Sequence, residues 1–168
     1  RKITRKEIEA TMSRVRSQLP DVAWRTTFIV GFPTETDQDF EELVDFVSEG
    51  HFQHLGIFLY SDEDNIRSSK FGDPIPLSLK EERKNRLMEI QQKISREHHQ
   101  KMVGSLQQVL VGGFSSETDL LLEGRNQYQG PEVDGVVYIN EGNATSAGFH
   151  QVEITEAHEY DLVGKILN

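Results

Sequence analysis

Two segments of the sequence place glycine, proline, aromatic and hydroxyl side chains directly after strand-like residues. The first is TTFIVGFPTET, in which five β-branched or aromatic residues run into Gly31, Phe32 and Pro33. The second is HLGIFLYS, which ends on Tyr60 and Ser61. Loops at strand ends are where α/β proteins bind ligands, because the strand and the following helix hold them in place. We therefore treat both loops as candidate binding segments.

The residue types in these loops indicate what each could do. Gly31 would let a ligand approach the backbone, Pro33 would fix the loop, and Glu35 would offer a polar contact. Tyr60 followed by Ser61 could hold a planar ring and its edge. Plainer interpretations stay open at this point: the first loop as an ordinary strand-to-helix turn, and Phe58 and Tyr60 as core residues with one wet end.

Composition limits the chemistry that the chain can hold by itself. Its 168 residues include no cysteine, so neither a disulfide nor a cysteine-bound zinc or iron–sulfur site can lie within it. No apolar run approaches the roughly 20 residues needed to span a bilayer, and the basic start RKITRKEIEA lacks the apolar core of a signal peptide. We expect a cytoplasmic protein without a membrane partner.

Charge divides the chain into two unequal parts. Residues 103–168 carry 2 basic and 10 acidic residues, a net charge of −8, whereas residues 1–102 carry 16 basic and 18 acidic residues, a net charge of −2. The second part is therefore a markedly acidic module. Among the less specific signals, the paired histidines His51/His54 and His98/His99 lack further ligands at metal-binding spacing. We interpret them as solvated surface residues.

Helix and strand signals alternate in the first part. Three residue pairs predict capping boxes at the starts of three helices: Thr4 with Glu7, Thr36 with Asp39, and Ser78 with Glu81. The apolar segments 26–30 and 54–60 read as buried strands. A strand, a helix and a strand at this spacing predict a right-handed βαβ unit with parallel strands and both faces covered. Because its sheet edges would be unpaired, this part looks like the end of a larger sheet or barrel.

The second part changes to short strands at about 106–112, 119–125, 134–140, 149–156 and 160–167, separated by Gly, Asn and Ser. Five strands at this spacing suggest a small barrel of the oligonucleotide-binding type. The fold class expected is α/β followed by all-β, with residues 1–102 and 103–168 as the two domains.

Taken together, these segments resemble the radical S-adenosylmethionine methylthiotransferases. The resemblance runs through RTTFIVGFPTETDQDFEELVDF, GIFLYSDEDN, GDPIPLSLKEERKNRLMEIQQKIS, EGRNQYQGPEVDGVVYI and VEITEAHEYDLVGKI. PEVDG and ITEAHEYDLVG resemble the RimO-type branch, which adds a methylthio group to an aspartate of the twelfth small-subunit ribosomal protein. The family usually has Gly where this sequence has Thr34, which stiffens the loop and leaves Glu35 in register.

The resemblance implies a partial (β/α) barrel followed by a TRAM domain, with S-adenosylmethionine and [4Fe-4S] clusters as cofactors. The cluster cysteines of the family lie in an earlier CxxxCxxC motif that this sequence lacks, so the chain alone is expected to be inactive and no catalytic or metal-binding residue is assigned. The residues that the resemblance places around S-adenosylmethionine are Ile29, Gly31, Phe32, Pro33, Glu35, Phe58, Tyr60 and Ser61.

Charge then separates the possible partners. An RNA-binding barrel gains affinity from Lys and Arg that neutralise phosphates, and this one is acidic, which favours a basic ribosomal protein over tRNA. Glu132 and Asp134 in the PEVDG turn are the expected docking residues. Two alternatives stay open: a tRNA methylthiotransferase of the isopentenyladenosine type, and a non-enzymatic adaptor whose acidic barrel binds a basic protein.

Overall fold

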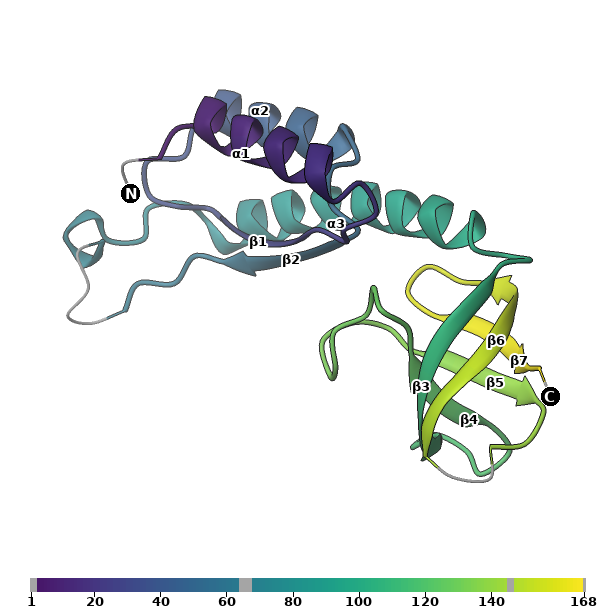
Figure 1. Ribbon diagram of the computed structural model, residues 1–168. Helices are drawn as coiled ribbons and strands as arrows, with labels where there is room; N and C mark the ends of the chain where they lie inside the picture. The colour runs from purple at the N-terminus through teal and green to yellow at the C-terminus, as the bar shows by residue number, and fades with distance from the viewer. Residues whose placement is uncertain (1–2, 64–67, 145–146, 168) are drawn as a thin grey trace.

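The protein consists of an α/β unit joined to a small closed barrel (Figure 1). The computed structural model describes residues 3–63, 68–144 and 147–167. The α/β unit contains α1 (Arg5–Gln18), β1 (Arg25–Val30), α2 (Asp37–Ser48), β2 (His54–Leu59), a short 3-10 helix (Ser69–Phe71) and α3 (Leu77–Gln100). The barrel contains β3 (Leu106–Phe114), β4 (Leu122–Arg125), β5 (Val137–Glu141), β6 (Gly148–Ala157) and β7 (Leu162–Ile166).

Two of the three predicted capping boxes are confirmed. The backbone N–H of Thr4 donates to the Glu7 carboxylate over 2.7 Å, and that of Thr36 donates to Asp39 over 2.8 Å. The third box, at Ser78 and Glu81, is wrong. Pro76 precedes α3 without a side-chain cap, so the preset dihedral of proline, rather than a serine hydroxyl, marks where this helix begins.

The βαβ unit has parallel strands, as predicted, with Arg25 opposite His54 and Val30 opposite Leu59. Helices cover one face of this two-stranded sheet (Figure 1). The buried residues between that face and the helices are Val30, Phe40, Val44, Val47, Ile57 and Leu87.

The expectation that both faces of the sheet are covered is wrong for the described residues. Ile29 and Phe58, which are paired in register, are 56% and 66% exposed on the face opposite the helices. Buried parallel strands have neighbours and cover on both sides, and this sheet has two unpaired edges and one open apolar face. The α/β unit therefore has the features of the end of a larger sheet.

The second part closes into a barrel, which confirms the all-β prediction. The strand order is β3-β4-β5-β7-β6, antiparallel except for the β5–β7 pair. Alternating side chains point inward and form its core: Val109, Val111, Val137, Ile139, Val152, Ile154, Leu162 and Ile166. Gly124 permits the tight packing, because a Cβ there would lie 2.6 Å from Cγ1 of Val109. None of the described helices combines the length and the apolar character that crossing a bilayer requires.

Truncating a barrel core residue should destabilise this part of the molecule. Leu162 is fully buried, so we expect Leu162→Ala to lower the free energy of unfolding by about 2–5 kcal/mol through lost burial and a residual cavity. Leu120→Ala is the matched control, because Leu120 is 89% exposed and its loss should change stability by under about 0.5 kcal/mol. Urea unfolding followed by circular dichroism measures both. Equal losses would contradict the placement of Leu162 in the core.

Candidate functional site

The loops that follow β1 and β2 lie side by side at one end of the sheet. The ladder continues one step beyond the strands, because the N–H of Tyr60 donates to the carbonyl of Val30 over 2.9 Å. The two segments that the sequence singled out are therefore brought together, with Ile29 and Phe58 immediately before them on the open face.

Three aromatic rings gather around these loops. The ring of Phe32 meets Tyr60 edge to face at 5.3 Å between centroids, and Phe71 follows at 6.2 Å from Phe32. Tyr60 is buried beneath Phe32, and its hydroxyl has no hydrogen-bond partner within the described part of the chain. A buried hydroxyl without a partner costs free energy, so this group is a candidate for bonding a ligand or a segment beyond this chain.

The reason for glycine at position 31 differs from the expected one. Gly31 has a φ of +78°, and a Cβ there would lie 2.8 Å from Cδ of Lys80 and closer still to its Cγ. The space beside this backbone is therefore filled by a lysine stem from α3 and is not left free for a ligand. Glycine is required here both for its conformation and for this close approach.

Glu35 is engaged within the protein. Its Oε1 accepts from the N–H of Gly31 over 3.0 Å and from Arg83 over 2.6 Å. Arg83 is itself buried, donates to Asp37 over 2.6 Å and lies over the ring of Phe40 at 5.2 Å. These contacts fix the shape of the 31–35 loop, so Glu35 holds the loop in addition to any contact with a cofactor.

The remaining predicted residues lie on the same loops. Pro33 is half-buried after Phe32, and exposed Ser61 donates its hydroxyl to Glu63 over 3.1 Å. The eight predicted cofactor-binding residues therefore form three groups. Ile29 and Phe58 are an exposed apolar pair, Phe32 and Tyr60 are an aromatic pair, and the others belong to the loops that follow the two strands. No group of three or more side chains suited to holding a metal ion occurs within residues 3–63, 68–144 and 147–167.

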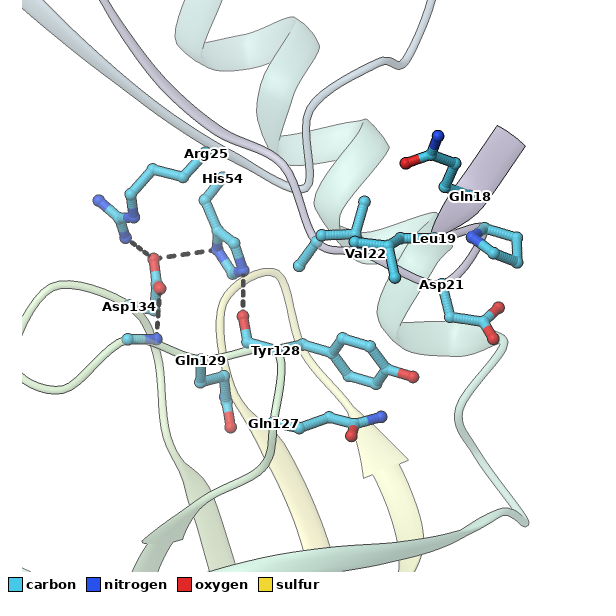
Figure 2. A pocket seen from close by; sticks show the side chains of 13 residues that line it. Gln18, Leu19, Asp21, Val22, Arg25, His54, Gln127, Tyr128, Gln129 and Asp134 are labelled. Carbon is cyan, nitrogen blue, oxygen red and sulfur yellow. Dashed lines mark hydrogen bonds and ion pairs between the residues drawn. The ribbon is translucent and has the colours of Figure 1, made fainter. Parts of the chain in front are cut away.

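A second concave region lies where the α/β unit meets the barrel (Figure 2). A cavity of about 690 Å³ opens between the α1–β1 connection and the loop that joins β4 to β5. At its edge the carboxylate of Asp134 forms an ion pair with Arg25, lies 3.0 Å from Nδ1 of His54, and accepts from the N–H of Gly130 over 2.7 Å. The other ring nitrogen of His54 is 2.8 Å from the carbonyl of Tyr128.

This junction corrects the expected role of Asp134. Its side chain is only 4% exposed, because it turns inward to two residues that begin the strands of the α/β unit. Asp134 is therefore an anchor between the two parts and not a surface charge for docking. Glu132 stays exposed in the same turn, with a φ of +62°.

Two of the four histidines that we interpreted as solvated surface residues are enclosed in the structure. His54 is largely enclosed at the junction, and His99 is 5% exposed on α3, where Nδ1 lies 3.1 Å from the carbonyl of His158. Burial lowers the pKa of both rings. The missed signal was spacing: Gln91, Ser95 and His99 recur every four residues, which places them on one face of a helix.

The two regions occupy opposite ends of the sheet. Arg25 and His54 are the first residues of β1 and β2, and the aromatic loops follow the last ones. Six residues of strand separate the two ends by roughly 17–20 Å. The barrel therefore contacts the amino-terminal ends of the strands, away from the predicted cofactor loops.

The buried His99 should make the stability of the chain depend on pH. Its pKa is lowered in the folded state, so the unfolded chain binds more protons once the pH falls below about 6.5, and stability should fall from there toward pH 5. His99→Gln should reduce this slope. His158→Gln is the control, because that ring is exposed and should leave the slope unchanged. Thermal unfolding across pH 5–8 measures the effect, and identical slopes for all three proteins would contradict the burial of His99.

Comparison with known proteins finds a matching domain family and similar proteins. The model of the TRAM domain matches residues 103–167. Proteins named ribosomal protein uS12 methylthiotransferase RimO are 49% identical over 167 residues in Bdellovibrio bacteriovorus, 45% over 164 in Desulfotalea psychrophila and 40% over 168 in Geobacter sulfurreducens. These matches cover 98–100% of this chain and 36–38% of each relative. The chain thus spans a little over a third of the length of these curated relatives and is similar to them over nearly all of its own length.

Proposed function

We propose that this chain is part of a radical S-adenosylmethionine enzyme that adds a methylthio group to an aspartate of ribosomal protein uS12. The observation that carries the proposal is the 40–49% identity to proteins of that name over nearly the whole chain. Residues 1–102 would supply the last strands of a (β/α) barrel, and residues 103–168 the TRAM domain. The unpaired edges and open face of the β1–β2 sheet support this division, because they call for further strands.

The residues at the strand ends suit the nucleoside part of S-adenosylmethionine. Ile29 and Phe58 offer an apolar platform, and the buried Tyr60 hydroxyl lacks a partner among the described residues. Such a mixture of apolar surface and a few fixed polar groups is typical of small-molecule sites. When bound beside an iron–sulfur cluster, this cofactor supplies the radical chemistry that activates an unreactive carbon. The cluster itself does not fit this chain, which has no cysteine to ligate it, so its ligands would come from elsewhere in the enzyme.

The chain's own contribution would be to bind and to orient. The loops at Gly31–Pro33 and Tyr60–Ser61 would hold the cofactor at the carboxyl ends of the strands, where (β/α) barrels place their chemistry. The aromatic cover of Phe32 over Tyr60 would keep water from that end of the site. In the cytoplasm, where ribosomal proteins are assembled, such an enzyme would act on a large substrate that the barrel helps to position.

The TRAM domain would meet a basic partner through its acidic residues. Of its ten acidic side chains, several are used internally, as Asp134 is by Arg25 and Glu153 is by Lys165 over 3.2 Å. The exposed ones include Glu117, Asp119, Glu132 and Glu141. Negative potential of this kind speeds the encounter with a positively charged protein.

One observation favours a tRNA-modifying alternative. On the outer face of the barrel, Phe149 and Arg125 flank Leu110, and all three line a shallow groove of about 450 Å³. An exposed aromatic ring beside an arginine is suited to stacking an unpaired base. The net charge of −8 on residues 103–168 opposes this alternative, because affinity for nucleic acid grows with the number of cationic side chains that contact phosphate.

An assay of which substrate is modified distinguishes the proposed uS12-modifying enzyme from the tRNA-modifying alternative. The complete protein that carries residues 1–168 would be reconstituted anaerobically with iron and sulfide and supplied with S-adenosylmethionine, excess sulfide as the sulfur donor and a low-potential one-electron reductant. It should add one methylthio group to uS12, seen by peptide mass spectrometry. Transfer RNA incubated in parallel should remain unmodified. Modification of tRNA with none of uS12 would replace the proposal with its alternative, and modification of neither would contradict both.

Docking should depend on Glu132 through its charge. Glu132→Lys should slow association with uS12, and the loss should shrink as salt rises, because exposed charges are screened over about 8 Å at physiological ionic strength. Glu89→Lys makes the same charge change on the exposed face of α3, away from the barrel, and should have a smaller effect. Stopped-flow binding across a salt series measures both. Equal, salt-independent rates for wild type and Glu132→Lys would remove Glu132 from the docking surface.

A further inference from the structure

Lys80, in the first turn of α3, is an almost completely buried lysine. It is 2% exposed, its Nζ donates to the carbonyl of Tyr60 over 2.8 Å, and it forms an ion pair with Asp73. The same Nζ lies 5.5 Å from the centre of the Tyr60 ring. One ammonium group is therefore shared by the loop after β2 and the loop before α3.

The stem of the same side chain reaches the end of the other strand. It occupies the space that a Cβ on Gly31 would fill, directly after β1. Lys80 thus touches the first residue beyond β1 with its methylene groups and the first residue beyond β2 with its ammonium group. Gly31 directly precedes Phe32, whose ring packs against Tyr60, so Lys80 contacts the backbone on both sides of this aromatic pair.

Stability alone does not explain a lysine at this position. Moving an ammonium group out of water has a desolvation cost that can exceed what an ion pair and a hydrogen bond return. An apolar side chain of similar length would fill the same space without that cost. What methionine or leucine would not supply is a charged donor to the carbonyl of Tyr60. That contact fixes the backbone of Tyr60, and with it the direction of the ring.

We propose that Lys80 is a positioning residue that sets the two strand-end loops, Gly31–Pro33 and Tyr60–Ser61, at the spacing needed to hold the nucleoside of S-adenosylmethionine. This inference rests on the proposed function. Lys80 acts through the loops and not by touching the cofactor, since its side chain is enclosed by Gly31, Tyr60 and Asp73. Arg83, one turn further along α3, gives similar support to the 31–35 loop through Glu35.

Binding of S-adenosylmethionine to the complete protein that carries residues 1–168 tests the inference. Lys80→Met keeps the stem and removes the charge, and we expect it to weaken binding about ten- to a hundredfold in calorimetric titration, the range for one charged hydrogen bond. Asp73→Asn keeps the contact with Tyr60 and should have a smaller effect. Lys93→Met, an exposed lysine of the same helix, is the matched control and should bind like wild type.

A second readout separates positioning from general loss of structure. In the absence of cofactor, amide hydrogen exchange of Lys80→Met should rise in residues 31–35 and 60–63 and stay unchanged in the barrel. In steady-state kinetics the KM for S-adenosylmethionine should rise while the KM for the protein substrate stays constant.

The outcomes distinguish this inference from the function on which it rests. Wild-type protein that fails to bind S-adenosylmethionine would contradict the proposed function. Wild-type protein that binds it, with Lys80→Met binding equally well, would overturn the inference alone. If amide hydrogen exchange of Lys80→Met is rapid throughout the protein, the Asp73→Asn variant decides. Faster exchange confined to residues 31–35 and 60–63, with weaker binding of S-adenosylmethionine, supports the positioning role. Binding with wild-type affinity overturns that role.

Discussion

The buried face of α3 is a row of polar side chains, and the arrangement of the molecule depends on it. Five side chains along this helix donate to backbone carbonyls or carboxylates of four other segments of the chain. The donors are Lys80, Arg83, Gln91, Ser95 and His99. A helix of 24 residues is about 36 Å long, so these contacts extend from the strand-end loops to the barrel. Only Leu87 among the fully buried residues of α3 is apolar. Polar contacts with fixed directions specify a geometry more narrowly than apolar packing, because each leaves a costly unpaired group if it shifts.

This polar face also explains which parts of the fold could be predicted. The capping boxes at Thr4 and Thr36 were recognisable because they involve residues three apart. The barrel was recognisable because five short strands recur at regular spacing, separated by Gly, Asn and Ser. In α3 the spacing of three apolar residues in the sequence, Leu87, Ile90 and Ile94, indicates a helix but not its contacts. Nothing local to Ser95 or His99 shows that their partners are the carbonyls of Glu159 and His158, some 60 residues away along the chain.

The candidate site shows the same division. Its location at two strand ends followed from Gly31, Pro33 and Tyr60, since only a loop accepts that combination after an apolar run. The roles of individual residues did not follow, because they depend on long side chains from elsewhere: Lys80 fills the space beside Gly31, and Arg83 engages Glu35. Asp134 was misplaced for a similar reason. A carboxylate in a turn looks exposed until the partners that enclose it, Arg25 and His54, are brought from 80 to 109 residues away.

The strand order of the barrel has a consequence for the time at which it can form during synthesis. β7 lies between β5 and β6, although it follows both in the chain. Until residues 162–166 have left the ribosome, β5 and β6 each lack one neighbour and the sheet has two unpaired edges. The barrel therefore closes in a single late step, and a nascent chain that pauses before Leu162 would expose Val137, Ile139, Val152 and Ile154 to other chains.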